Sequence, residues 1–221
     1  MRIVLIGAGG HGKVALEALR DVRSGRARTR AYTVAGFLDA DATLSGSIVA
    51  GVPVLGGIDL LPRLARARRV GGAFVAIGDN RTRLHYMQLV RQAGIHLISA
   101  VHPAAVVSTS ATVGDNVLVA AGATVSAASV LCDGAIVNTG AVVDHECVVA
   151  EGAHVCPASA LAGRVRVGEG AFLGLGCRVI QCLTVGAWAT VGAGAVVLQD
   201  VPEAATVVGV PAKRIDRPGR K

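Results

Sequence analysis

The segment Asp144-His145-Glu146 contains residue types that can accept and hold a proton. An imidazole titrates near neutral pH, and an adjacent carboxylate can orient it and raise its basicity, as a general base requires. A second histidine, His154, follows nine residues after His145. The alternative is that His145 is an ordinary solvated histidine in a turn, and the residue types alone leave both interpretations open.

A glycine-rich segment near the start, residues 7–12 (GAGGHG), matches the pattern G-x-G-x-x-G. It follows a predicted strand and opens a predicted helix, a context in which backbone N–H groups can approach a diphosphate. Asp39, at the end of the next predicted strand, can accept a hydrogen bond from a ribose or a base. A nucleotide sugar fits this segment better than NAD(P), since a dinucleotide usually needs two βαβ halves. NAD(P) and a purely structural turn remain the alternatives.

A polar segment, residues 77–83 (IGDNRTR), follows a third predicted strand. Ligands of parallel sheets bind at the carboxyl ends of strands, so these residues are candidates for binding. The segment is equally consistent with a helix start capped by Asp79 or Asn80.

Strands and helices are predicted to alternate through the first hundred residues, which favours a small parallel sheet. We therefore expect a Rossmann-like α/β nucleotide-sugar-binding domain over residues 1–101. The predicted strands are 3–6, 33–38 and 73–77, and the predicted helices are 11–21, 60–68 and 81–93.

A repeat of six residues begins at Val107 and continues to Val197. A small or medium-sized residue precedes most repeat positions by two, and Gly, Asp, Asn and Ser cluster between them. A period of six fits neither a helix nor a hairpin sheet, but it fits a parallel β-helix in which three hexads make one triangular coil. We predict this β-helix over residues 102–204, followed by a basic tail over 205–221. The repeat positions are Val107, Val113, Val119, Val125, Leu131, Val137, Val143, Val149, Val155, Leu161, Val167, Leu173, Val179, Val185, Val191 and Val197.

The coil of three hexads predicts which residues are stacked. Gly163 follows His145 by three hexads and should lie about 4.8 Å above or below it, where its N–H can donate to an oxyanion. His154 is half a coil from His145 and should lie on another side of the prism. If both histidines serve one site, a neighbouring subunit must supply one, which indicates a cyclic oligomer such as a trimer.

The composition agrees with a narrow, regular interior. The chain has 221 residues, of which 52% are hydrophobic and only 3% aromatic, so it is not a disordered chain. The net charge of +7 arises outside the repeat, since residues 101–204 hold 3 basic and 8 acidic residues. Without aromatic residues to stack bases, nucleic acid is an unfavourable partner, and anionic small molecules are favoured.

The uncharged stretch 179–199 carries the hexad period, so no membrane span is expected. No signal peptide is predicted, because glycines interrupt the first apolar run, and the five cysteines include no C-x-x-C pair. A cytoplasmic protein with reduced thiols is expected. Cys147 and Cys177 fall on inward positions and Cys156 and Cys182 on turns, which disfavours a catalytic cysteine; no metal is needed.

Four motifs together resemble one family over nearly the whole chain: GAGGHGK at 7–13, IGDNRTR at 77–83, VDHECV at 143–148 and GVPAKRI at 209–215. They are similar to the bacterial hexapeptide-repeat sugar acetyltransferases, which include sialic acid O-acetyltransferase and the N-acetyltransferases of bacillosamine and perosamine synthesis. The resemblance implies a left-handed β-helix, a homotrimer with active sites between subunits, and acetyl-CoA as co-substrate.

The resemblance also implies residue roles. His145 is the general base and Glu146 raises its basicity. The residues that match acetyl-CoA contacts are His154, Gly163, Leu175 and Ala193, and those that match nucleotide-sugar contacts are Gly9, Gly10, His11, Asp39 and Ala40. Ala193 stands where the family commonly has glycine. Lys213, Arg214 and Arg217 can neutralise the phosphates of CoA or can simply be a solvated terminus.

The expected function is N-acetylation of the C4 amine of a nucleotide-linked 4-amino-4,6-dideoxy sugar, of the UDP-bacillosamine-precursor or GDP-perosamine type, in glycan or lipopolysaccharide synthesis. O-acetylation of a sialic acid is the second candidate. A non-catalytic scaffold that binds a sugar nucleotide is the third, although a scaffold has no use for the pair His145-Glu146.

Overall fold

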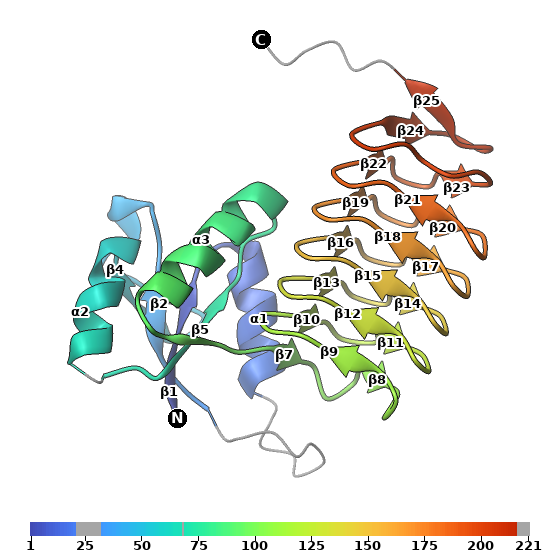
Figure 1. Cartoon of the computed structure of the whole chain (residues 1–221). Helices are drawn as coiled ribbons and strands as arrows, with labels where there is room; N and C mark the ends of the chain where they lie inside the picture. Colours follow the sequence, from blue (N-terminus) through green and yellow to red (C-terminus); the bar gives the residue numbers. More distant parts are fainter. Residues whose placement is uncertain (21–31, 68, 216–221) are drawn as a thin grey trace. The chain divides into compact units, whose positions relative to one another are not determined.

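The structure, a computed structural model, describes residues 1–20, 32–67 and 69–215 (Figure 1). They form two compact units, one within Met1–Pro103 and one from Ala104 onward. Of the residues named above, Asp21 and Arg68 at the ends of predicted helices and Arg217 in the tail lie outside the described residues.

The first unit is built on a sheet with the strand order β3-β4-β2-β1-β5-β6. All neighbouring strands are parallel except β3 and β4, which form an antiparallel hairpin. The strands are β1 (Arg2–Ile6), β2 (Thr33–Leu38), β3 (Ile48–Val49), β4 (Val52–Gly56), β5 (Gly72–Val75) and β6 (His96–Leu97), with β7 (Ala100–Val101) after them. The helices are α1 (Gly10–Arg20), α2 (Leu61–Arg66) and α3 (Asn80–Gln92), with short 3-10 helices η2 (Ala42–Leu44) and η3 (Ile58–Leu60).

The predicted parallel α/β domain is confirmed, with element ends that differ by one or two residues. The sequence analysis missed β3, β4 and β6. β3 and β6 are two residues long, and β4 contains Pro53, which lowers its propensity for a strand. Pairing with neighbouring strands holds these segments in the sheet, and a local pattern does not contain that information.

The polar segment 77–83 contains a helix cap, as one of its two interpretations predicts. The Asp79 carboxylate caps α3 by accepting a hydrogen bond from the Thr82 N–H at 2.8 Å. The hydrogen bonds that Asp79 accepts from the backbone and the side chain of Thr82 lower the pKa of Asp79. Arg83 is fully buried and donates to the Ile77 carbonyl and to Asn80 Oδ1, each at 2.8 Å. The hydrogen bonds of Asp79 and Arg83 therefore stabilise the turn between β5 and α3.

The second unit is a left-handed parallel β-helix of two-residue strands that recur every six residues (Figure 1). Paired strands are three hexads apart, as in Ile136 with His154 and Val142 with Ala160, which confirms the predicted coil. We call the three sheets of the prism I, II and III. Sheet I contains β10 (Leu118–Val119), β13 (Ile136–Val137), β16 (His154–Val155), β19 (Phe172–Leu173), β22 (Thr190–Val191), β24 (Thr206–Val208) and β25 (Lys213–Ile215); sheet II contains β8 (Val106–Val107), β11 (Thr124–Val125), β14 (Val142–Val143), β17 (Ala160–Leu161), β20 (Arg178–Val179) and β23 (Val196–Val197); sheet III contains β9 (Thr112–Val113), β12 (Val130–Leu131), β15 (Val148–Val149), β18 (Arg166–Val167) and β21 (Thr184–Val185).

The interior of the prism consists of the repeat positions and the small residues that precede them. From Val119 to Val197 every repeat position is at most 2% exposed. The turns between strands place every sixth residue from Asn116 to Gly194 at positive φ, which glycine adopts most easily. Glu146 and Arg164 occupy two of these positions, with φ of 58° and 63°. The turn geometry thus sets the direction of both side chains.

The β-sheet continues past the predicted end of the β-helix. Residues from Thr206 to Ile215, which the sequence analysis assigned to the basic tail, include β24, parallel to β22, and β25, antiparallel to β24. The uncharged stretch 179–199 forms strands β20 to β23 and their turns. Within the described ranges, no helix combines the length and apolar character needed to cross a bilayer.

Candidate functional site

A pocket of about 390 Å³ lies at the carboxyl ends of β1, β2 and β5 in the first unit. Parallel α/β sheets bind ligands at this edge, since the strand ends and the starts of the following helices converge there. The pocket is lined by every residue that the sequence analysis proposed for the nucleotide sugar, together with residues of the 77–83 segment. These residues are Gly9, Gly10, His11, Asp39 and Ala40, with Ile77, Gly78 and Thr82.

The glycines of the loop formed by residues 7–12 differ in the space around their Cβ positions. Gly7 has a φ of 102°, and a Cβ on it would lie 2.8 Å from the Ala76 carbonyl oxygen. A Cβ on Gly12 would collide with the Gly7 carbonyl oxygen. Gly9 and Gly10, in contrast, have no atom within 4 Å of a Cβ position. Gly7 and Gly12 therefore allow the turn itself, whereas Gly9 and Gly10 leave space on the pocket side.

The Asp39 carboxylate holds the glycine loop in place. Its two oxygens accept hydrogen bonds from the Ala8 N–H at 2.6 Å and the Asp41 N–H at 2.9 Å. A carboxylate oxygen can accept more than one hydrogen bond, so Asp39 can also accept one from a ligand hydroxyl. The sequence analysis predicted only this second role.

The His11 imidazole at the start of α1 is neutral at physiological pH. Burial, and secondarily the positive charge of Arg83, lower the pKa of His11 to about 4. The pocket therefore presents an uncharged imidazole, which can donate one hydrogen bond and accept another.

We expect Gly12→Ala and Gly10→Ala to have contrasting effects. The first should lower the melting temperature, because a methyl group at residue 12 meets backbone that cannot move aside. The second should leave the melting temperature nearly unchanged, because a Cβ at residue 10 meets no other atom, and should weaken binding of GDP or UDP several-fold, because residue 10 lines the pocket. Thermal unfolding and isothermal titration calorimetry separate the two, and equal effects of both variants on stability would contradict this assignment.

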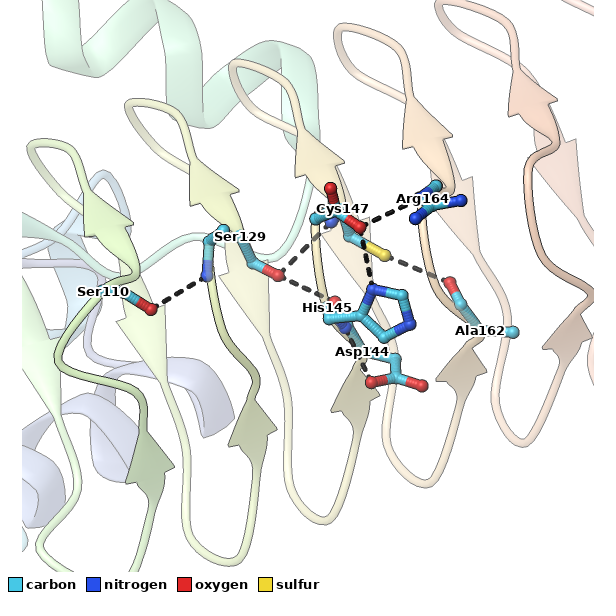
Figure 2. A network of polar contacts seen from close by, with 9 residues as sticks. Ser110, Ser129, Asp144, His145, Cys147, Ala162 and Arg164 are labelled. Atoms are coloured by element: carbon cyan, nitrogen blue, oxygen red, sulfur yellow. Dashed lines mark hydrogen bonds and ion pairs between the residues drawn. The ribbon is translucent and has the colours of Figure 1, made fainter.

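A second cluster of chemically active groups lies at the corner between sheets II and III (Figure 2). His145 Nδ1 lies 3.1 Å from Glu146 Oε2, and Arg164 Nε donates to the same oxygen at 2.9 Å. The three side chains are 49–63% exposed. Hydrogen bonds from Arg164 and then from His145 lower the pKa of Glu146, so this carboxylate is ionised at neutral pH.

The charge on Glu146 determines the tautomer of His145. An ionised carboxylate can only accept hydrogen bonds, so Nδ1 of His145 must carry the proton and Nε2 has the free lone pair. The arrangement is that of a general base held by an acidic partner. Both His145 and Glu146 were predicted from the sequence as site residues, but Arg164 was not. Arg164 nevertheless follows Glu146 by the same three hexads that separate Gly163 from His145.

Gly163 lies against the imidazole, as the hexad period predicts. A Cβ on Gly163 would overlap His145 Nε2 and Cε1, so the missing side chain keeps Nε2 accessible. Among the described residues, no hydrogen-bond acceptor is found for the Gly163 N–H. This N–H can therefore donate to a ligand oxygen next to the base.

A buried serine supports the turn that carries His145. Ser129 Oγ donates to the Asp144 carbonyl at 2.7 Å and accepts from the Cys147 N–H at 3.3 Å, so it joins the two ends of the turn. The Asp144 carboxylate accepts from the His145 N–H at 2.7 Å. Figure 2 shows Ser129 in the coil next to this turn.

The remaining predicted contact residues lie elsewhere on the β-helix. His154 is on β16 of sheet I, 6% exposed, and Asn138 Nδ2 lies 3.1 Å from its Nε2. Leu175, 57% exposed, and Ala193 occupy the corner between sheets I and II, and Lys213 is exposed on β25. A single chain does not bring these residues to the His145 corner.

The cysteines do not form a nucleophilic site among the described residues. Cys147 and Cys177 are fully buried, as predicted. Cys156 lies in the turn between β16 and β17, as predicted, but it is only 5% exposed, and burial raises its pKa to about 12. In the described part of the chain, no group of three or more potential metal-ligating side chains is found.

Comparisons with known proteins find matches to both units of the chain. A family model described as the PglD N-terminal domain matches residues 2–90. A variant of GDP-perosamine N-acetyltransferase from Caulobacter crescentus, solved with CoA and GDP-perosamine, is 47% identical, with 98% of this chain and 97% of that chain covered and a TM-score of 0.90. The acetyltransferase domain of PglB from Neisseria gonorrhoeae FA1090, solved with acetyl coenzyme A, is 39% identical, with 97% of this chain and 98% of that chain covered and a TM-score of 0.86.

Curated relatives match over a shorter stretch. The serine acetyltransferase of Bacillus licheniformis is 51% identical over 43 residues, which are 20% of this chain and 20% of that protein. The match thus spans about a fifth of the length of the curated relatives. The solved structures, in contrast, match along nearly the whole chain at 39–47% identity. The chain therefore belongs to the bacterial hexapeptide-repeat sugar acetyltransferases, a family of CoA-dependent enzymes.

Proposed function

We propose that this protein transfers the acetyl group of acetyl-CoA to the C4 amine of a nucleotide-linked 4-amino-4,6-dideoxy sugar. The observation that carries the proposal is the His145-Glu146 pair next to Gly163, in a chain 47% identical to a GDP-perosamine N-acetyltransferase. The glycine-loop pocket, with backbone N–H groups at the start of α1, supports a nucleotide diphosphate as the carrier of the sugar.

In the proposed mechanism His145 Nε2 accepts a proton from the amine as the amine nitrogen attacks the thioester carbonyl. The Glu146 carboxylate stabilises the resulting imidazolium through Nδ1. When the bond between carbon and sulfur breaks, His145 returns the proton to the sulfur, so the products are the acetamido sugar and CoA thiol. The reaction requires no covalent intermediate on the enzyme.

Gly163 has a separate role in this mechanism. Its N–H lies beside the base and donates to the oxygen that becomes negative when the carbonyl carbon turns tetrahedral. A backbone donor is fixed before the reaction and needs no reorganisation, which makes it effective in stabilising a transition state.

The active site is proposed to form between subunits of a homotrimer. His154, Leu175 and Ala193 align with acetyl-CoA contacts of the family, yet they lie on other parts of the prism than His145. A neighbouring chain can supply them to the His145 corner if three prisms pack around an axis. Sedimentation equilibrium should give three times the 22.3 kDa chain mass, and an active monomer would exclude a shared site.

The substrate is tested by thiol release from acetyl-CoA in the presence of GDP-, UDP- and dTDP-linked 4-amino sugars and of free sialic acid. We expect release with at least one nucleotide-linked amino sugar, with the GDP-perosamine type as the first to test. Mass spectrometry should show an acetamide. Release with sialic acid alone would contradict the amine mechanism and favour O-acetylation.

We also propose a compartment and a pathway for the reaction, and residues that contact the phosphates of CoA. The five cysteines are free thiols, which agrees with a reducing compartment, and we place the reaction in the cytoplasm. Family relationship suggests a role in glycan or lipopolysaccharide synthesis. Lys213 and Arg214, both exposed on β25, are proposed to neutralise phosphates of CoA.

Ser129→Ala is expected to lower kcat more than its contribution to stability explains. The variant removes the hydroxyl that joins both ends of the His145 turn, at a cost of about 1 kcal/mol in the free energy of unfolding. Ser159→Ala is the matched control, because Ser159 is equally buried and donates to the Gly174 carbonyl, in the turn that carries Leu175 rather than His145. Both variants should lose similar stability in urea. At saturating acetyl-CoA only Ser129→Ala should lose kcat, whereas Ser159→Ala should change at most the KM of acetyl-CoA through Leu175. Equal kinetics of the two would show that Ser129 does not position the base.

A further inference from the structure

The Glu146 carboxylate accepts hydrogen bonds from two side chains. Its Oε2 accepts from His145 Nδ1 at 3.1 Å and from Arg164 Nε at 2.9 Å. The side chain of Glu146 is about half exposed, and without a second partner it could rotate away from the imidazole into water. Arg164 restricts that rotation, because the carboxylate is held from the neighbouring coil as well as from its own turn.

The backbone of both coils is fixed where these side chains begin. The Glu146 N–H donates to the Ala127 carbonyl at 2.9 Å, and the Arg164 N–H donates to the His145 carbonyl at 2.9 Å. Each turn is thereby attached to the coil before it. Arg164 and Glu146 therefore start from defined positions one coil apart, and their contact follows from the stacking of the coils.

The ion pair between Glu146 and Arg164 is too exposed to contribute much to the free energy of unfolding. Arg164 is 63% exposed and Glu146 49% exposed, and ion pairs at this exposure contribute little to folding. Because Glu146 also contacts His145, the ion pair can instead hold the imidazole in one orientation. Next to this pair, the Asp144 carboxylate accepts a hydrogen bond from the His145 backbone N–H, and the Cys182 side chain interacts with Arg164.

We propose that Arg164 is a positioning residue for the base: its Nε holds the Glu146 carboxylate on Nδ1 of His145, so that the neutral imidazole carries its proton on Nδ1 and the lone pair of Nε2 faces the substrate. The proposal rests on the function proposed above. Arg164 touches neither the sugar nor the acetyl group in this assignment and acts only through Glu146.

The first experiment needs no substrate. The ¹⁵N chemical shifts of the His145 imidazole are measured against pH in the wild type, Arg164→Ala and Arg164→Lys, with His145→Gln to assign the signals. We expect one dominant tautomer with the proton on Nδ1 in the wild type and a mixture of both tautomers in Arg164→Ala. Arg164→Lys should be intermediate, because an ammonium group replaces the charge but not the planar donor. An unchanged tautomer in Arg164→Ala would overturn the proposal, whatever the enzyme acetylates.

The second experiment uses the kinetics of acetyl transfer. Arg164→Ala should lower kcat about tenfold, with the KM of either substrate within about a factor of two. Arg166→Ala is the matched control, since it removes the same charge from an exposed residue of the same hexad. It should leave kcat unchanged.

A double-mutant cycle shows whether Arg164 acts through Glu146. In the Glu146→Gln background, Arg164→Ala should cause no further loss of kcat, because the carboxylate that Arg164 holds is gone. Additive losses would overturn the proposal, as would a loss confined to the KM of acetyl-CoA, which would make Arg164 a cofactor contact. If the wild type shows no transfer to any sugar, the proposed function fails while the NMR measurement still decides the role of Arg164.

Discussion

His145→Asn is expected to lower kcat by about three orders of magnitude while the protein keeps its fold. Asparagine retains a polar side chain in the turn but cannot accept a proton from the amine at neutral pH. The fold should survive because His145 is half exposed and its side chain contacts Glu146 rather than the core.

The loss is measured as thiol release at saturating concentrations of both substrates, with circular dichroism to verify the fold. His96→Asn is the control, since His96 is an exposed histidine on β6 that does not line the glycine-loop pocket and belongs to the first unit, whereas His145 belongs to the second. Added imidazole should restore part of the activity of His145→Asn if Nε2 is the base. Turnover within a factor of ten of the wild type would remove His145 from the mechanism.

Leu161→Ala is expected to lower the free energy of unfolding by about 2 to 5 kcal/mol. Leu161 is 1% exposed on β17 and stacks between Val143 and Val179 of the adjacent coils. The coils are hydrogen bonded on all three sides, so the backbone cannot close the cavity that the shorter side chain leaves. Because each coil is stabilised by its neighbours, the loss should extend to the coils above and below.

Urea denaturation followed by circular dichroism measures this effect. Val106→Ala is the control, because Val106 belongs to the same sheet II and is 64% exposed. It should change the free energy of unfolding by less than about 0.5 kcal/mol. A loss below about 1 kcal/mol in Leu161→Ala would mean that the prism can repack, contrary to the regular core seen here.

The β-helix could be predicted in detail because its geometry repeats. Once the period of six is recognised, counting residues gives the sheet, the direction of each side chain and the residue in the next coil. The contact of Gly163 with His145 follows from this count alone. Handedness does not follow from the period and came from the family resemblance.

Counting residues along the period of six also stacks Arg164 on Glu146, but this count does not predict their ion pair. It predicts that the two residues are stacked, and it does not give the torsion angles that bring Nε to Oε2. In the first unit there is no such repeat, and the short strands β3, β4 and β6 were missed. Their place in the sheet depends on partners distant in sequence.

The sequence by itself determined the architecture of the β-helix, the glycine loop and the pair His145-Glu146, since these depend on residue type and spacing along the chain. Only the tertiary structure decided how these groups are charged and held. Burial next to Arg83 keeps His11 neutral, Arg164 shares the Glu146 carboxylate with His145, and Ser129 supports the turn that carries His145. The physical reason is that burial and hydrogen bonding are set by neighbours in space, and these neighbours come from other parts of the chain.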